Sequence, residues 1–462
     1  MGKKGYTIYK TNLNKSEIIM IRNELNVKPH LLHSAVKIEY AIYRESENKM
    51  YLPRYYGLEK FGNFENKLSK GLPINIEFKG ELFPYQNVII DKYITHVGES
   101  GGGLLDVEPG KGKTVMALNI ISKLKKKTLV IVHKTFLMNQ WIERIQMFLP
   151  GAKIGRIQGD IIDIENKDIV LGMLQSLSGK EYDPTLWDSF GLCVFDECHH
   201  LSAEVFSNIM INIVCNYNLG LSGTMKRKDG LSKVFEYFIG PIVHKEKTDV
   251  TTEVLIKSIK VTFNEFDKVK TDFRGNPMYS TMINVLDCDE RNRFITEVVK
   301  NELKINPNQQ IMILSNTKNL ITNLYEKIKV FEESIGYYVG GMKEEKLKES
   351  ETKKIILATY AMASEGLDIK TLTTLIMATP KSDVCQSIGR ILRSKHETPL
   401  VIDIIDTHDV FNSQYKKRCV YYNSKNFRVE NYKCPTSYFL NEYTVKDDKG
   451  KGKNKIKCLI KL

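Results

Sequence analysis

The sequence has no uninterrupted apolar run long enough to cross a bilayer, and no apolar core follows its first five residues as it would in a signal peptide. Gly2 alone would suggest N-terminal myristoylation, but Tyr6 stands where that signal has Ser or Thr. These absences argue against a membrane, secreted or lipid-anchored protein. With 42% hydrophobic and 27% charged residues among 462, the composition is that expected of a soluble globular protein, and the length has room for two or three domains.

Cysteine is also scarce, and the eight residues are scattered over the chain, as is typical of reduced intracellular thiols. One group, Cys193, Cys198, His199 and His200, is close enough in sequence to suggest zinc. No second Cys or His pair lies near it at the spacing of structural zinc sites, and Cys193 falls within an apolar strand. We therefore expect no bound zinc.

Acidic residues are fewer than basic ones, 55 against 68, which gives a formal net charge of +13 and a pI near 9.0. A basic surface suits a polyanionic partner such as nucleic acid. Charge alone is weak support, because many basic proteins bind no nucleic acid.

Short apolar strands alternate with helical patterns along most of the chain, which predicts an α/β protein with parallel sheets covered by helices. We expect four segments: a small mixed domain over 1–79, two α/β lobes over 80–245 and 246–425, and an extension over 426–462 with a flexible basic tail. The expected strands lie at Leu104–Leu105, Thr128–Val132, Asp168–Leu171, Leu192–Phe195 and Leu219–Leu221 in the first lobe, and at Gln310–Leu314, Lys354–Ala358, Thr374–Met377 and Leu400–Asp403 in the second.

A glycine-rich turn follows the first of these strands and opens a helix. Gly110 and Gly112 allow backbone N–H groups to approach phosphate closely, and the helix N-terminus adds partial positive charge. Lys113 is expected to contact the β- and γ-phosphates of ATP, and the Thr114 hydroxyl to bind Mg²⁺. The usual eight-residue pattern begins with Gly, where this chain has Val107.

A second phrase completes the triphosphatase site, because Asp196 and Glu197 follow the strand Leu192–Phe195. We expect Asp196 to hold the metal and Glu197 to polarise the attacking water. A chance Gly-Lys-Thr explains the turn alone, but not the turn together with two carboxylates at a strand end. Further candidates are Gln86 for the adenine edge, His199 for coupling to the second lobe, and Ser222 and Thr224, which either relay between the lobes or cap a helix.

The second lobe carries Gln386, Arg390 and Arg393 at helical spacing, so that one face holds an amide and two guanidinium groups. Arginine stabilises charge on a transferring phosphoryl group. The first lobe has no obvious arginine finger, so closure of the two lobes is expected to complete the site. Gly366 permits close backbone approach, and Asp368 is a candidate ligand of the ribose.

These motifs, in this order, resemble superfamily 2 helicases and translocases over about residues 80–425, and within them the XPB-like branch. The resemblance is carried by Ile169–Ser178, Phe195–Leu201 and Leu219–Gly230. The chain has Ser222-Gly223-Thr224 where the family usually has Ser-Ala-Thr, and Arg227-Lys228-Asp229 where eukaryotic XPB has Arg-Glu-Asp. The phrases Tyr43–Asn48 and Tyr51–Gly57 are similar to helicases of large cytoplasmic DNA viruses, of the poxvirus transcript-release type.

The resemblance implies two tandem RecA-like lobes, ATP hydrolysis with Mg²⁺, binding of single-stranded and duplex DNA, 3′→5′ polarity and a monomer. It also implies a role in viral transcription, recombination or repair, with RNA or a transcription complex as further partners, in the host cytoplasm or the virion. A single strand is then expected to cross both lobes, held through its phosphates by loops that follow strands. The candidates are Lys134, Gln140, Gln175, Ser315 and Thr359.

For each of these residues taken singly, a solvated loop is an equally good interpretation. Trp141 is expected to pack within a helix rather than to stack on a base, and Arg274-Gly275-Asn276 is a candidate strand-separating hairpin. Three functions stay open: a DNA helicase or translocase, which we favour; an RNA helicase, because the sequence has no clear reader of the 2′-hydroxyl; and a nucleotide-gated scaffold. A scaffold would not need Glu197 and the arginine helix.

Overall fold

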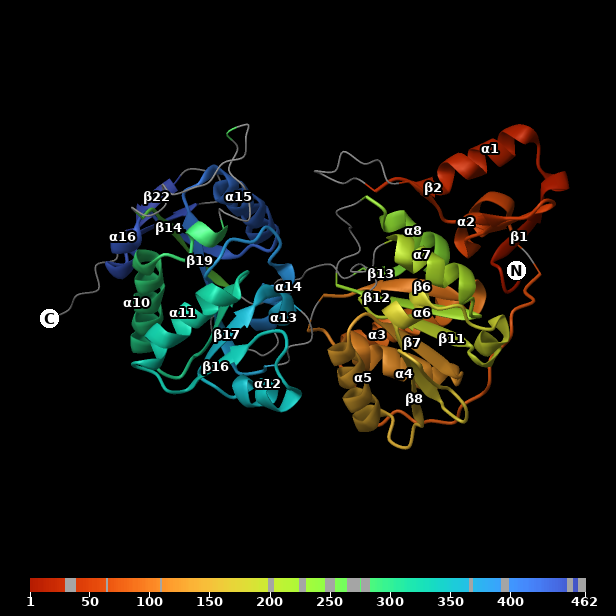
Figure 1. The fold of residues 1–462 in the computed structure, drawn as a ribbon, viewed down its shortest axis with the longest axis horizontal. Helices are drawn as coiled ribbons and strands as arrows, with labels where there is room; N and C mark the ends of the chain where they lie inside the picture. Colours follow the sequence, from red (N-terminus) through yellow and green to blue (C-terminus); the bar gives the residue numbers. More distant parts are fainter. Residues whose placement is uncertain are drawn as a thin grey trace. The chain divides into compact units, whose positions relative to one another are not determined.

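Two large sheets organise the chain, one in each of its two units, Met1–Lys247 and Thr248–Leu462 (Figure 1). The computed structural model describes residues 1–29, 39–63, 65–108, 110–197, 203–223, 230–245, 254–263, 275, 283–364, 369–391, 399–446 and 452–455.

The first unit begins with a small antiparallel sheet. Its three strands are β1 (Tyr6–Tyr9), β5 (Lys49–Leu52) and β4 (Arg44–Glu45), in that order, and β2 (Asn26–Val27) pairs with β3 (Tyr40–Ala41). The helices are η1 (Lys10–Asn12), α1 (Lys15–Glu24) and α2 (Arg54–Phe61). A capping box starts α1, because the Asn14 side chain accepts from the Glu17 N–H and the Glu17 carboxylate accepts from the Asn14 N–H.

The N-terminal segment is attached to the rest of the first unit by polar and aromatic contacts. Arg54 Nη1 donates to the carbonyl oxygen of Asn216 (2.8 Å), and the rings of Tyr56 and Tyr237 meet edge to face with centroids 5.2 Å apart. Arg54 is buried, and its hydrogen bond to Asn216 is partly shielded from solvent. The small sheet therefore lies on the first lobe rather than apart from it.

The first lobe has an eight-stranded sheet in the order β13, β6, β12, β11, β7, β10, β8, β9, in which only the edge strand β9 runs antiparallel to its neighbour. The strands are β6 (Gly102–Asp106), β7 (Thr128–Val132), β8 (Ile154–Gln158), β9 (Ile161–Asp163), β10 (Ile169–Met173), β11 (Leu192–Phe195), β12 (Tyr217–Ser222) and β13 (Ile242–Lys245). The helices are α3 (Pro84–Ser100), α4 (Lys113–Leu124), α5 (Thr135–Phe148), α6 (Leu174–Gly179), η2 (Pro184–Ser189), α7 (Ala203–Asn212) and α8 (Ser232–Ile239).

Alternate residues of each strand face opposite helix layers. In β7, Val130 and Val132 pack with α3, α4 and α5, whereas Leu129 and Ile131 pack with α6, α7 and α8. Strands covered on both faces read as nearly continuous apolar runs, as β7 does from Leu129 to Val132.

The second lobe has a nine-stranded sheet in the order β16, β17, β15, β18, β19, β14, β20, β21, β22, parallel as far as β20 and antiparallel beyond it. The strands are β14 (Leu255–Val261), β15 (Gln310–Ser315), β16 (Ile335–Tyr338), β17 (Ile355–Thr359), β18 (Leu372–Met377), β19 (Leu400–Asp406), β20 (Arg428–Tyr432), β21 (Tyr443–Lys446) and β22 (Gly452–Lys455). The helices are α10 (Asp289–Ile305), α11 (Lys318–Lys329), α12 (Glu344–Glu351), α13 (Tyr360–Ser364), α14 (Cys385–Ile391), α15 (Asp409–Ser424) and α16 (Pro435–Phe439).

The expected α/β class with two parallel-sheet lobes is confirmed, and each of the nine expected strands forms. Within the expected basic tail, Gly452–Lys455 pairs with β21 as β22, and the expected flexibility of the tail stays a prediction. The division into four segments stays a prediction. Among the described residues, no helix is both long and apolar enough to span a membrane.

Candidate nucleotide site and strand-end loops

The glycine-rich turn lies between β6 and α4, and its backbone explains its glycines. Gly110 and Gly112 have φ of 87° and 79°, a region that side chains disfavour. A Cβ atom on Gly112 would also collide with Nε2 of Gln86. That buried amide donates to the carbonyl oxygen of Lys111 (3.0 Å) and accepts from the N–H of Phe83 (3.0 Å). Gln86 thus braces the turn in this conformation, and its role as an adenine contact stays a prediction.

Lys113 and Glu197 come together although 84 positions separate them in the chain. Their side chains form an ion pair of 3.1 Å, and Lys113 Nζ also donates to the carbonyl oxygen of Val107 (3.3 Å). Lys113 is buried at the first position of α4, with Thr114 next to it. Glu197 has φ of 47°, an uncommon conformation for a residue other than glycine, and such strain often marks functional sites.

Asp196 is buried at the end of β11, beside Glu197. Its Oδ2 atom accepts a hydrogen bond of 2.8 Å from Nε1 of Trp141, and its backbone N–H donates to the carbonyl oxygen of Ile131 in β7 (3.2 Å). Burial, and then the neighbouring charge of Glu197, raise the pKa of Asp196 to about 6. Two adjacent carboxylates, one buried, are hard oxygen ligands that a divalent cation would stabilise, so the donor set fits Mg²⁺.

Ser222, the last residue of β12, borders the same turn. It is fully buried, and its carbonyl oxygen accepts from the N–H of Val107 (2.9 Å). The structure does not describe the side chains of most remaining candidates. His199, Thr224, Gly366, Asp368 and Arg393 lie outside the described residues, as do Cys198, His200, Arg274 and Asn276; Gln386 and Arg390 belong to α14, and only their backbone is described.

The chain segments at the carboxyl ends of β7, β8 and β10 are tied together in the first lobe. Gln175 donates through Nε2 to the carbonyl oxygen of His133 (2.9 Å), and Gln158 donates to the Thr135 hydroxyl (3.1 Å). The Ser176 hydroxyl accepts from the N–H at position 159 (2.8 Å). Two of the predicted nucleic-acid contacts lie here with exposed side chains, Lys134 just before α5 and Gln175 in the first turn of α6, and Gln140 lies half-buried in α5.

The second lobe places its two candidates differently. Thr359 ends β17 and is half-buried, at the carboxyl end of the strand. Ser315 is fully buried, and its hydroxyl accepts from the N–H of Thr317 (3.0 Å). In this conformation the Ser315 hydroxyl stabilises the turn to Thr317, and Asn316, which follows it, is exposed.

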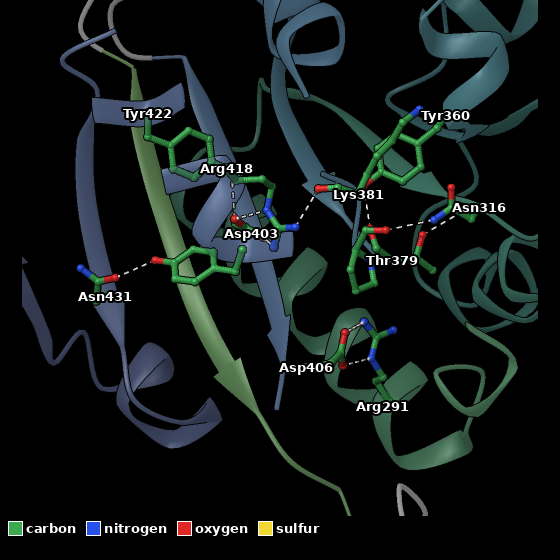
Figure 2. Close-up of polar contacts among 12 residues, drawn as sticks. Arg291, Asn316, Tyr360, Thr379, Lys381, Asp403, Asp406, Arg418, Tyr422 and Asn431 are labelled. Carbon is green, nitrogen blue, oxygen red and sulfur yellow. Dashed lines mark hydrogen bonds and ion pairs between the residues drawn. The ribbon is translucent and has the colours of Figure 1, made fainter. Parts of the chain in front are cut away.

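A segment of the second lobe, Thr379–Lys381, leads towards α14 and is held by three other elements (Figure 2). The N–H of Asn316, after β15, donates to the Thr379 hydroxyl (2.8 Å). The hydroxyl of Tyr360, at the start of α13, donates to the Thr379 carbonyl (2.7 Å). Arg418 Nη1, in α15, donates to the last carbonyl oxygen of the segment (2.8 Å). These hydrogen bonds connect the ends of β15 and β17 to the segment that precedes α14, the helix that carries Gln386 and Arg390.

Arg418 is itself fixed by a buried ion pair (Figure 2). Its Nε and Nη2 atoms donate to the two oxygens of Asp403, each at 2.8 Å, and the Tyr422 hydroxyl donates to the same carboxylate (2.9 Å). A second pair, Arg291 with Asp406, is equally buried and bidentate, at 2.7 and 2.9 Å. Bidentate guanidinium–carboxylate pairs fix geometry as well as charge.

Sequence reasoning missed the contact of Trp141 with the site. Its predicted packing within a helix is confirmed, since it is 1% exposed in α5. A buried indole N–H usually requires an acceptor. That requirement was a signal in the sequence, but nothing in the sequence identified Asp196 as the acceptor.

Comparison with known proteins assigns this chain to a family. Residues 79–227 match the family described as "Type III restriction enzyme, res subunit", and residues 294–395 match "Helicase conserved C-terminal domain". The chain is 36% identical over 447 residues to "Putative ATP-dependent RNA helicase L396" of Acanthamoeba polyphaga mimivirus, covering 93% of this chain and 86% of that relative. The chain belongs to the superfamily 2 helicases. The predicted recognition is confirmed, and the protein is an ATP-dependent nucleic-acid helicase.

Further relatives of this helicase also come from large DNA viruses. It is 26% identical over 408 residues to "Putative helicase 161L" of Invertebrate iridescent virus 6, covering 83% of this chain and 90% of that one. Among solved structures, the Type ISP restriction-modification enzyme LlaBIII bound to DNA matches with a TM-score of 0.53 at 16% identity. That match covers 79% of this chain and 31% of the other, and it is a likeness of fold alone.

Proposed function

We propose that this helicase is a DNA motor that couples hydrolysis of Mg²⁺·ATP to 3′→5′ movement along one strand, separating a duplex or releasing a transcript. The observation that carries the proposal is the meeting of Lys113 with Glu197, 3.1 Å apart and directly beside the buried Asp196. An ammonium group at the first turn of a helix and two carboxylates at a strand end are the parts that phosphoryl transfer requires.

Each residue then has a distinct task. Backbone N–H groups after Gly110 and Gly112 would hold the phosphates, and Lys113 would exchange Glu197 for the β- and γ-phosphates. Thr114 and Asp196 would hold Mg²⁺, which supplies charge neutralisation between the phosphates. Released from Lys113, Glu197 would orient the attacking water. Gln386, Arg390 and Arg393 would stabilise charge on the transferred group, Gly366 and Asp368 would contact the nucleotide, and His199, Ser222 and Thr224 would couple its state to movement.

Nucleic acid would follow the strand-end loops. The strand ends joined in the first lobe present an exposed Lys134, an exposed Gln175 at the start of α6 and the start of α5, groups that bind phosphates without reading bases. A motor that steps over any sequence needs such sequence-independent contacts. In the second lobe Thr359 and the turn shaped by Ser315 would continue the track. We propose DNA as the substrate and a monomer as the working form.

A second candidate, an RNA helicase, is favoured by the printed name of the mimivirus relative. Steady-state ATPase rates without ligand and with matched single-stranded DNA, duplex DNA and RNA, at two salt concentrations, separate the two. Stimulation by DNA over RNA that weakens with salt is expected, and preferential stimulation by RNA would replace DNA as the substrate. Displacement of a strand from 3′-tailed but not 5′-tailed duplexes checks the polarity.

The site itself is tested by Lys113→Ala and Glu197→Gln. We expect both variants to lose ATP turnover by at least about a hundredfold while keeping their fold, because each removes a group required in the transition state. Full activity in both would refute the assignment. A folded protein that hydrolyses ATP without response to any nucleic acid would instead support the nucleotide-gated scaffold.

A further inference from the structure

The hydrogen bond from Trp141 to Asp196 links the helix that begins at the predicted nucleic-acid contacts to the carboxylate predicted to bind metal. The indole Nε1 atom and Asp196 Oδ2 are 2.8 Å apart, and the two residues are 1% and 6% exposed. A donor that reaches a carboxylate in a buried site restricts the rotation of that carboxylate, because no water competes for it. The plane of the Asp196 carboxylate is therefore set in part by a residue outside the two triphosphatase motifs.

The same helix also begins at the strand-end loops. α5 starts at Thr135, whose hydroxyl accepts from Gln158 (3.1 Å), and the preceding His133 carbonyl accepts from Gln175 (2.9 Å). Trp141 lies six residues further along, which is about 9 Å of helix. One rigid element therefore contacts the predicted track at its start and the metal-binding carboxylate within its second turn.

Packing makes Trp141 a good transmitter of displacement. It is buried in the face of the sheet that α3, α4 and α5 cover, together with Met138 and Ile145 of its own helix. A close-packed interior transmits small shifts rather than absorbing them. Aliphatic or phenyl side chains would fill this position, but an indole also donates a hydrogen bond, and that donor is directed at Asp196.

Resting on the proposed function for the role of Asp196, we propose that Trp141 is a positioning residue. It holds the Asp196 carboxylate in the orientation that binds Mg²⁺, and α5 transmits occupancy of the loop His133–Lys134 by a nucleic-acid backbone to that carboxylate. Nucleic acid then stimulates ATP hydrolysis partly by tightening the site around the metal.

The test is Trp141→Phe in the full chain, with Trp187→Phe as the matched control. Trp187, in η2, is also buried in the first unit. Its ring lies against those of Tyr182 and Phe190, which flank η2 in the chain. ATPase rates are measured while Mg²⁺ is titrated at saturating ATP, with and without oligo(dT). We expect Trp141→Phe to raise the KM for Mg²⁺ by about tenfold, as for a lost hydrogen bond to a charged group, and to lower the stimulation by oligo(dT) severalfold. The control should change neither.

A KM for Mg²⁺ and a stimulation factor that both stay at the control's values would overturn the proposal. Should Trp141→Phe fail to fold, the control supplies a second measurement, because the chain has two tryptophans and Trp141 is then the sole tryptophan, which can be excited selectively over tyrosine. Its emission should change when oligo(dT) is added without nucleotide, and an unchanged emission would overturn the coupling. If nothing stimulates the wild-type ATPase, the proposed motor function fails, and the Mg²⁺ titration alone decides the positioning role.

Discussion

Replacement of Asp403 by Asn should destabilise the second unit strongly. Asp403 and Arg418 are each 1% exposed and share two hydrogen bonds of 2.8 Å. Asn keeps the shape of the side chain but removes its charge, which leaves the buried guanidinium uncompensated. Breaking one partner of a buried pair costs about 3–5 kcal/mol in free energy of unfolding. Tyr422 loses a charged acceptor as well, so we expect the upper part of that range.

The matched control is Lys348→Met. Lys348 pairs with Glu344 at 3.4 Å on the surface of α12, with side chains 59% and 50% exposed. An exposed pair of this kind contributes about 0.3–0.5 kcal/mol. The two variants break ion pairs in the same unit, so the difference between them isolates the effect of burial.

Urea unfolding followed by two probes measures the loss and locates it. Both tryptophans, Trp141 and Trp187, lie in the first unit, so their emission reports that unit, whereas far-UV circular dichroism reports both. Asp403→Asn should shift the dichroism transition to lower urea and leave the tryptophan transition near its original midpoint. A loss of free energy no larger than that of Lys348→Met would refute the reasoning.

Three further outcomes are expected. Gly112→Ala should lower ATP turnover at least about tenfold, because it combines a left-handed φ with a collision at Gln86; Gly151→Ala, also at positive φ but in open space, should cost stability alone. The KM for Mg²⁺ should rise as pH falls through about 6, because a proton then competes with the metal for Asp196, whose pKa burial raises to about that value; a KM independent of pH between 5.5 and 7.5 would contradict this linkage. Arg54→Met should lower the free energy of unfolding of the first unit by about 1–3 kcal/mol, read from tryptophan emission, because it removes the hydrogen bond from a buried guanidinium to the Asn216 carbonyl oxygen; an unchanged tryptophan midpoint would contradict it.

The predicted strands formed because their sequences are apolar on both faces. Thr128–Val132 and Leu192–Phe195 are buried throughout, and central parallel strands require this pattern. The strand β14 was not predicted, because Lys257 and Lys260 interrupt its apolar residues. It is nevertheless an interior strand, paired with β19 on one side and β20 on the other. Lys257 is tolerated there because its ammonium group pairs with Glu302 at 2.6 Å. That partner is 45 positions away and cannot be found from local pattern.

The residues of the candidate site also differ in whether a local sequence motif identifies them. Lys113, Asp196 and Glu197 were predictable because each lies in a short motif whose residue types are required by the chemistry. Gln86 was identified, but its bond to the turn depends on where α3 packs, which no motif states. Arg418 was not identified, because a lone arginine in a polar helix is indistinguishable from a solvated one until Asp403 is placed beside it.

Each lobe, considered by itself, contains a hydrogen-bonded path from residues at its strand ends towards predicted catalytic groups. In the first, the strand-end loops connect through α5 and Trp141 to Asp196. In the second, the loop after β15 and the start of α13 connect through Thr379 to the approach to α14. Neither connection is needed to form a parallel sheet, and each uses a hydrogen bond away from bulk solvent, where its geometry is best defined. A helicase must make ATP hydrolysis depend on its strand, and these two bonded paths run from predicted strand contacts to predicted catalytic groups. Loss of either path alone should therefore leave a folded ATPase that responds less to nucleic acid.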